Sequence, residues 1–218
     1  MALCFPAGGP DWALLAAGAV GFLGATNYST GAKFKYCGLG VPFVAFLMGP
    51  LELFAAMELL HPARGTAAVC GTAVGALLLS VPVALLVCVI LHGNDMRDMA
   101  SDRAAGIRTT AMALGPKGAL ALYGRCHFFP FAFLLALAIL AARNGWPCAA
   151  PLALPLLALP VSAATVRRAR RIHSEWAAQP PENRPETPPW RGLERDSGKA
   201  HLIFGALYAL ALALVRHG

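Results

Sequence analysis

Long runs of apolar residues, separated by short polar stretches, make up most of this chain. Four runs, at positions 39–60, 67–91, 118–142 and 146–166, each reach the roughly 20 residues that a helix needs to cross a bilayer. Two more, at positions 12–26 and 199–215, are shorter. Because lipid offers the backbone no hydrogen-bond partners, such segments cross it as helices. The pattern predicts an all-α fold, a multi-pass transmembrane helical bundle of about six helices.

Glycine and proline mark where these helices end or break. Gly106 is placed to end the helical turn that follows the second long run. Gly115 and Pro116 separate the polar residues after that turn from the run 118–142. The run 146–166 contains four prolines, which lack the N–H of a helical hydrogen bond, so we expect it to be kinked.

One long polar segment, residues 167–198, interrupts the apolar pattern near the C-terminal end and holds five prolines. We expect it to be a cytosolic loop. Loops of this length in compact proteins are usually either functional or disordered. A lid over a site is therefore one interpretation of this segment.

Composition supports a membrane protein, because 57% of the residues are hydrophobic and only 13% are charged, against about 25% charged in soluble domains. The net charge of +7 invites a nucleic-acid interpretation, but the distribution of the charge argues against one. If six spans are taken in order, 14 of the 18 lysines and arginines fall on one side: Lys33, Lys35, Arg97, Arg103, Arg108, Lys117, Arg167, Arg168, Arg170, Arg171, Arg184, Arg191, Arg195 and Lys199. This positive-inside bias places that side in the cytosol. We expect membrane lipid around the chain and no nucleic-acid partner.

An acidic segment follows directly on the run 67–91. If it is helical, Asn94, Asp98 and Asp102 repeat every four residues, and Asp95 lies three residues before Asp98. Such spacings place side chains on one helix face. Carboxylate and amide oxygens that converge in this way suit Mg²⁺, although an isolated motif of this kind is more often a solvated acidic turn.

A second polar loop, at positions 27–36, lies on the same expected side of the membrane as the acidic segment. It carries Lys35 and Tyr36, which are of the types that bind a diphosphate. Aromatic and basic residues at helix ends also serve as interfacial anchors, and the spacing alone favours the anchor.

Three stretches of the sequence resemble one known family. The run 94–109, NDMRDMASDRAAGIRT, closely resembles the second aspartate-rich motif of the UbiA superfamily of intramembrane prenyltransferases, most of all its menaquinone (vitamin K2) branch. The stretch 30–40, TGAKFKYCGLG, with Gly49 and Pro50, resembles the family's segment ahead of that motif, and 197–205, SGKAHLIFG, resembles its final helix. The resemblance is collinear from about Gly18 to the C-terminus.

The resemblance implies a function. Family members use Mg²⁺ to bind an isoprenyl diphosphate and transfer its chain to an aromatic acceptor, here of the naphthoquinone type. Carried over to this sequence, the metal ligands are Asn94, Asp95, Asp98 and Asp102, and Asp98 and Asp102 are the catalytic carboxylates. The diphosphate-binding residues are Lys35, Tyr36, Arg97 and Arg103.

One feature departs from the family pattern. The family has about nine helices and a first N-x-x-x-D motif that faces the second, whereas Asn94 is the only asparagine here with aspartate four residues later. We therefore expect residues 1–218 to form a single UbiA-like domain that is either N-terminally incomplete or lacks half of the metal site. The alternative function is a catalytically impaired relative that binds lipid or protein. From the resemblance we expect the protein in the membrane of the endoplasmic reticulum or Golgi if the chain is eukaryotic, and in the plasma membrane if the chain is bacterial.

Overall fold

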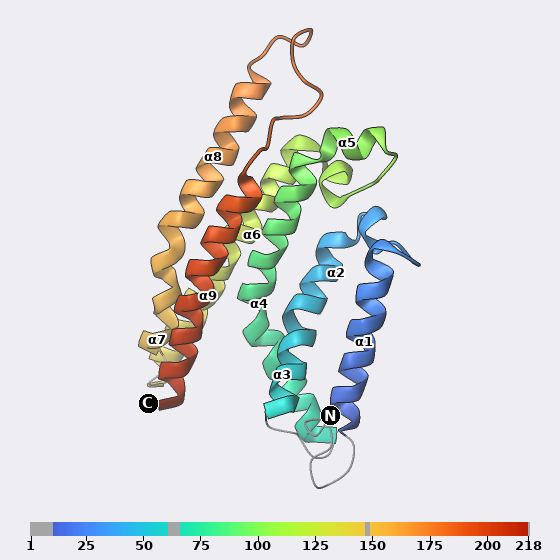
Figure 1. Cartoon of the computed structure of the whole chain (residues 1–218). Coiled ribbons are helices and arrows are strands. Elements are labelled where there is room, and N and C mark those ends of the chain that lie inside the picture. The colour runs from blue at the N-terminus through green and yellow to red at the C-terminus, as the bar shows by residue number, and fades with distance from the viewer. Residues whose placement is uncertain (1–10, 61–65, 147–148, 218) are drawn as a thin grey trace.

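The computed structural model describes residues 11–60, 66–146 and 149–217. Nearly all of them are helical: α1 Trp12–Ser29, α2 Gly40–Phe46, α3 Glu52–Leu60, α4 Thr66–Arg97, α5 Met99–Ala104, α6 Thr110–Arg143, α7 Ala149–Ala153, α8 Leu159–Ala177 and α9 Leu193–His217. The described residues form no strand. The expected all-α helical bundle is confirmed (Figure 1).

Five segments are long and apolar enough to cross a membrane, at Gly40–Leu60, Ala67–Arg97, Thr110–Arg143, Ala149–Ala177 and Leu193–Val215. They correspond to five of the six expected spans. The sixth, near residues 12–26, is the helix α1, which is not among the five. Many large apolar side chains on these helices are exposed, including Leu77, Phe129 and Leu202. Exposed apolar surface on spanning segments fits contact with lipid.

Helix α4 is the centre of the bundle and packs against α6 and α9 on one side and α2 and α3 on the other. The core between α4, α6 and α9 contains the fully buried side chains of Leu86, Met96, Tyr123 and Phe204. Long apolar helices that bury one stripe against each other and expose the rest are what a bundle in lipid requires. The acidic segment begins in the last turn of α4, so the packing of α4 holds the first residues of the segment in position.

The breaks in the helices lie where glycine and proline predicted them. Gly115 has φ 66° and ψ 173° inside α6, a conformation that only glycine adopts readily, and Pro116 follows it. The fifth span changes from α7 to a 3₁₀ segment, Leu154–Ala158, and then to α8, with Pro155 and Pro160 at the junctions. The second span contains a π-helical stretch, Leu47–Leu51, around Pro50, which no sequence pattern indicated. Pro147 lies outside the described residues.

The polar segment 167–198 is partly helical. Residues up to Ala177 extend α8 and those from Leu193 begin α9, so the connection itself covers only residues 178–192. Trp176 fixes it by donating a hydrogen bond from its indole N–H to the Pro185 carbonyl at 2.7 Å, and Trp190 is fully buried against the core. Figure 1 shows this connection at the same end of the bundle as α5 and the loop between α1 and α2.

Candidate functional site

The acidic segment spans the junction between α4 and α5. Helix α4 ends at Arg97, and Asp98 at the junction has φ −92° and ψ 2°, outside the ideal helical values. Helical hydrogen bonding nevertheless continues, because the Asp98 N–H donates to the Asn94 carbonyl at 2.9 Å and the Asp102 N–H donates to the Asp98 carbonyl at 2.8 Å. The four-residue repeat of Asn94, Asp98 and Asp102 therefore runs along one side of a nearly continuous helix, as the spacing predicted.

Helix α5 ends at the glycine that the sequence indicated. Gly106 has φ 70°, its N–H donates to the Arg103 carbonyl, and the Ile107 N–H donates to the Asp102 carbonyl at 2.8 Å. This pair of bonds is a Schellman motif, which closes a helix on a left-handed residue. It fixes the position at which the chain turns back towards α6.

Lys35 belongs to the 3₁₀ turn Phe34–Tyr36, which is held near the acidic segment by contacts that are distant in sequence. Cys37 forms an isolated parallel bridge with Arg108, and the Thr110 hydroxyl donates to the Gly38 carbonyl at 2.9 Å. These contacts attach the loop between α1 and α2 to the connection between α5 and α6. The structure thus brings Lys35 to the carboxylates, as a diphosphate-binding role requires.

The charges of this cluster act on one another. Burial raises the pKa of Asp102, the neighbouring Asp98 carboxylate raises it further, and the Lys35 ammonium lowers it. The buried carboxyl of Asp95 experiences the charges of the same three residues. Asp95, Asp98, Asp102 and Lys35 therefore form one electrostatic group of three carboxyl groups and one ammonium group.

The two arginines of the segment are held in ion pairs. The Arg97 guanidinium donates to both carboxylate oxygens of Asp98, at 2.7 Å and 2.8 Å, and lies 3.2 Å from a carboxylate oxygen of Glu194 at the start of α9. Arg103 pairs with Glu186 of the connection 178–192. Both guanidinium groups thus lie beside the acidic group. A bound anion would compete with the carboxylates of Asp98, Glu194 and Glu186 for them.

Two tyrosines complete the surroundings. The Lys35 Nζ lies 5.8 Å from the ring centroid of Tyr36. Tyr28 at the end of α1 has a buried hydroxyl without a hydrogen-bond partner among the described residues, and its pKa is raised by burial and then by the charges of Asp95 and Tyr36. Sequence reasoning missed Tyr28 as a site residue, because no spacing linked it to the motif. Its position beside Asp95 makes it a site candidate.

The donors of the acidic segment suit a hard cation, since they are the carboxylate oxygens of its aspartates and the amide oxygen of Asn94. Within the described part of the chain, no three His, Cys, Asp or Glu side chains converge closely enough to hold a metal ion by themselves. Mg²⁺, however, is usually held by one or two carboxylates, with waters and substrate phosphates supplying the other ligands. The arrangement fits a metal shared with a diphosphate and does not fit a cage built from protein alone.

Comparison with known proteins decides the family. The sequence profile of the UbiA prenyltransferase family matches residues 1–179 of this chain. The chain belongs to the UbiA prenyltransferase family. The resemblance that the run 94–109 indicated is thereby confirmed, and the bundle is that of an integral membrane protein of the family.

Similar proteins come from several animals. The chain is 31% identical to UbiA prenyltransferase domain-containing protein 1 of Homo sapiens over 198 residues, which cover 91% of this chain and 49% of the human protein. The Xenopus tropicalis protein of the same name is 33% identical over 88% of this chain and 46% of its own length. The Drosophila melanogaster homologue is 29% identical over 84% of this chain and 43% of its own length. The chain thus spans about half the length of these UbiA relatives.

Proposed function

We propose that this chain takes part in the transfer of an isoprenyl chain from an isoprenyl diphosphate to an aromatic acceptor of the naphthoquinone type, in menaquinone (vitamin K2) or related prenylquinone biosynthesis. The observation that carries the proposal is the electrostatic group of Asp95, Asp98, Asp102 and Lys35 at one end of an apolar bundle in a UbiA family member. A polar head and an apolar chain need such a boundary between charged and apolar surroundings.

In the proposed site, Asn94, Asp95, Asp98 and Asp102 supply the oxygens for Mg²⁺, with Asp98 and Asp102 as the catalytic carboxylates. Mg²⁺ bound there would act as a Lewis acid and template for the diphosphate. Asp98 also pairs with Arg97. When Mg²⁺ and the diphosphate bind, the Asp98 carboxylate would therefore contact the cation and the Arg97 guanidinium would contact the diphosphate.

Four further side chains would hold the diphosphate. Lys35, Arg97 and Arg103 offset its negative charge, since ammonium and guanidinium groups both suit phosphate. Tyr36 lies beside Lys35, and Tyr28 has a buried hydroxyl free to donate within the described part of the chain. Fixed donors aimed at charge that develops as a bond breaks are usually the largest contribution to catalysis.

The reaction itself is a substitution at an allylic carbon. The bond between the first carbon of the isoprenyl chain and the diphosphate oxygen breaks, and the diphosphate leaves with the electron pair. The electron-rich ring of the acceptor forms the new carbon–carbon bond and then loses a ring proton. The apolar surroundings keep water away from the allylic cation and so protect it from hydrolysis.

We place the acidic segment on the cytosolic side, because 14 of the 18 lysines and arginines fall on its side of the membrane when six spans are taken in order. The animal sources of the similar proteins favour the endoplasmic reticulum or Golgi over a bacterial plasma membrane.

The second candidate function is a catalytically impaired relative that binds lipid or protein partners. It is favoured by one observation, namely that the 218 residues contain a single N-x-x-x-D motif, at Asn94. A site built on this motif alone would offer fewer stabilising donors, and one donor fewer can lower a rate by about 10²–10³, so diphosphate binding would survive better than turnover. The acidic segment binds Mg²⁺-diphosphate in both candidates.

The test is an assay of the purified chain in detergent with geranylgeranyl diphosphate, Mg²⁺ and a naphthoquinol. Prenyl transfer that disappears in Asp98→Ala supports the enzyme. Magnesium-dependent binding of the diphosphate without transfer supports the impaired relative. Transfer that is indifferent to Asp98→Ala contradicts the proposed site.

A further inference from the structure

A second concentration of charge lies away from the acidic segment, in a groove between α6 and α8. Lys117 and Arg125 of α6 and Arg170 of α8 line this groove, which has a volume of about 500 Å³. All three side chains are exposed. No acidic residue lines the groove, and none of the three cations has an ion-pair partner among the residues that the structure describes.

The floor of the groove is apolar. Leu120, Gly124 and Phe128 follow Lys117 at spacings of three and four, so they lie with Lys117 and Arg125 on one face of α6. At Gly124 the two helices approach closely, since an added Cβ would lie 3.6 Å from Val166 of α8. The groove thus combines a basic rim with an apolar base, as an amphiphile with an anionic head requires.

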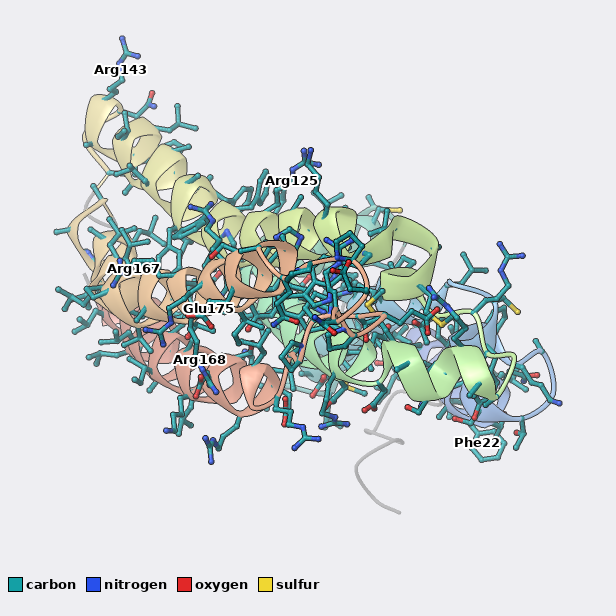
Figure 2. All side chains as sticks on the ribbon, turned by 90° about the horizontal axis from the view of Figure 1, so that it is seen from above. Phe22, Arg125, Arg143, Arg167, Arg168 and Glu175 are labelled. Atoms are coloured by element: carbon teal, nitrogen blue, oxygen red, sulfur yellow. The ribbon has the colours of Figure 1, made fainter. Side chains whose placement is uncertain are left out.

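Arg125 is the residue that needs an explanation. It lies within a membrane-spanning segment, eight residues and therefore about 12 Å along the helix from Lys117. Figure 2 shows it extending outward from the surface of α6. A lipid-facing arginine at this depth is costly unless its guanidinium reaches the interface or meets an anion.

Neighbouring arginines on α8 do not share this situation. Arg168 pairs with Asp196, and Arg171 lies 3.9 Å from Glu175 on its own helix. Arg170, between them, lines the groove together with Arg125. Arg167 also has no ion-pair partner among the described residues, but it does not line the groove, so Arg170 is the basic residue of α8 that is available to a ligand there.

We infer that the α6–α8 groove binds an anionic phospholipid, whose phosphate contacts Lys117, Arg125 and Arg170 and whose acyl chains lie against Phe128 and the lipid-facing surface below it. Basic pockets between transmembrane helices are suited to anionic head groups. The inference does not depend on prenyl transfer, because none of the acidic segment's residues lines this groove.

The test is native mass spectrometry of the delipidated whole chain, mixed with phosphatidylglycerol or with phosphatidylcholine of the same acyl chains. We expect phosphatidylglycerol to be retained several-fold better. The double variant Arg125→Ala, Arg170→Ala should lower the retention of phosphatidylglycerol about tenfold, to the phosphatidylcholine level. The double variant Arg125→Lys, Arg170→Lys should keep most of the phosphatidylglycerol retention.

The matched controls are Arg171→Ala, the next residue on α8, and Arg143→Ala, at the other end of α6; each removes one positive charge outside the groove. Both should retain phosphatidylglycerol as the unchanged chain does. Equal retention of the two lipids, or full retention by the double alanine variant, would overturn the inference. Displacement of the lipid by soluble pyrophosphate or by a polyglutamate peptide would also overturn it, since the groove would then serve a soluble anion or an acidic protein segment.

Discussion

The ammonium of Lys35 lies close enough to the carboxylate of Asp102 to lower its pKa, although Asp102 belongs to α5 and Lys35 to the 3₁₀ turn between α1 and α2. Burial and the Asp98 carboxylate act in the opposite direction and prevail, so the pKa of Asp102 is raised above its ordinary value of 3.8. Without a bound cation the group therefore holds more negative charge than its surroundings favour.

Asp102→Asn should raise the apparent Tm of the ligand-free chain in EDTA at neutral pH. A carboxyl whose pKa is raised in the folded state destabilises the fold when it is ionised, and this effect is present above the raised pKa and vanishes as the pH falls below 3.8. The gain should shrink accordingly on acidification. Thermal unfolding in detergent measures it, with Glu175→Gln, an exposed acid of α8, as the control.

Excess Mg²⁺ should remove that advantage, because the cation neutralises the same carboxylates. If Asp102→Asn lowers the apparent Tm in EDTA at neutral pH, Asp102 is stabilised by its surroundings as an ion and the electrostatic description is wrong.

Glu186→Gln should tighten the binding of Mg²⁺-diphosphate by up to about fivefold, because exposed ion pairs are worth about 0.2–1 kcal/mol and this one competes for Arg103. The stability of the chain should change little, since both partners are about half exposed. Titration of the diphosphate into the purified protein measures the change. Glu182→Gln, in the same connection, is the matched control, and identical affinities for the two variants would remove Arg103 from the site.

Local sequence features predicted much of the fold. The lengths of the apolar runs indicated the spanning helices, and Gly106, Gly115 and Pro160 marked ends and breaks, because each acts on the backbone within a few residues of itself. The six expected spans became five candidates because α1, although 18 residues long, ends in the polar residues 27–29 and is not apolar enough over its full length. The apolar pattern alone could not show whether α1 spans the membrane, since many of its residues are glycine and alanine, which are only weakly apolar.

The site was predictable only in part. The four-residue spacing predicted that Asp98 and Asp102 share one side of a helix, since that follows from helix geometry alone. The pairing of Arg103 with Glu186, the approach of Lys35 and the position of Tyr28 all depend on how distant segments pack. The sequence also could not show that the carboxylates fall short of a protein-only metal site, because this depends on rotamers and on the pairing of Asp98 with Arg97.

Gly93→Ala should destabilise the chain by about 1–3 kcal/mol and weaken diphosphate binding. An added Cβ would lie 3.2 Å from the Glu194 backbone nitrogen, so α9 would have to move away from α4 directly beside the acidic segment. Gly71→Ala, on the same helix with no atom within 4 Å of the added Cβ, should be neutral or slightly stabilising. Equal apparent Tm values for the two variants would show that the α4–α9 contact is looser than described.

The central claim is that the segment from Asn94 to Asp102 binds an isoprenyl diphosphate together with Mg²⁺. The most direct measurement is the affinity of the purified chain for geranylgeranyl diphosphate, with Mg²⁺ or EDTA, in the unchanged chain, in Asp98→Asn and in the control Glu175→Gln. Losing one charged partner costs about 1.5–3 kcal/mol, so Asp98→Asn should bind roughly 10- to 100-fold more weakly, and EDTA should abolish the difference. Binding that is unchanged by both Asp98→Asn and EDTA would contradict the claim.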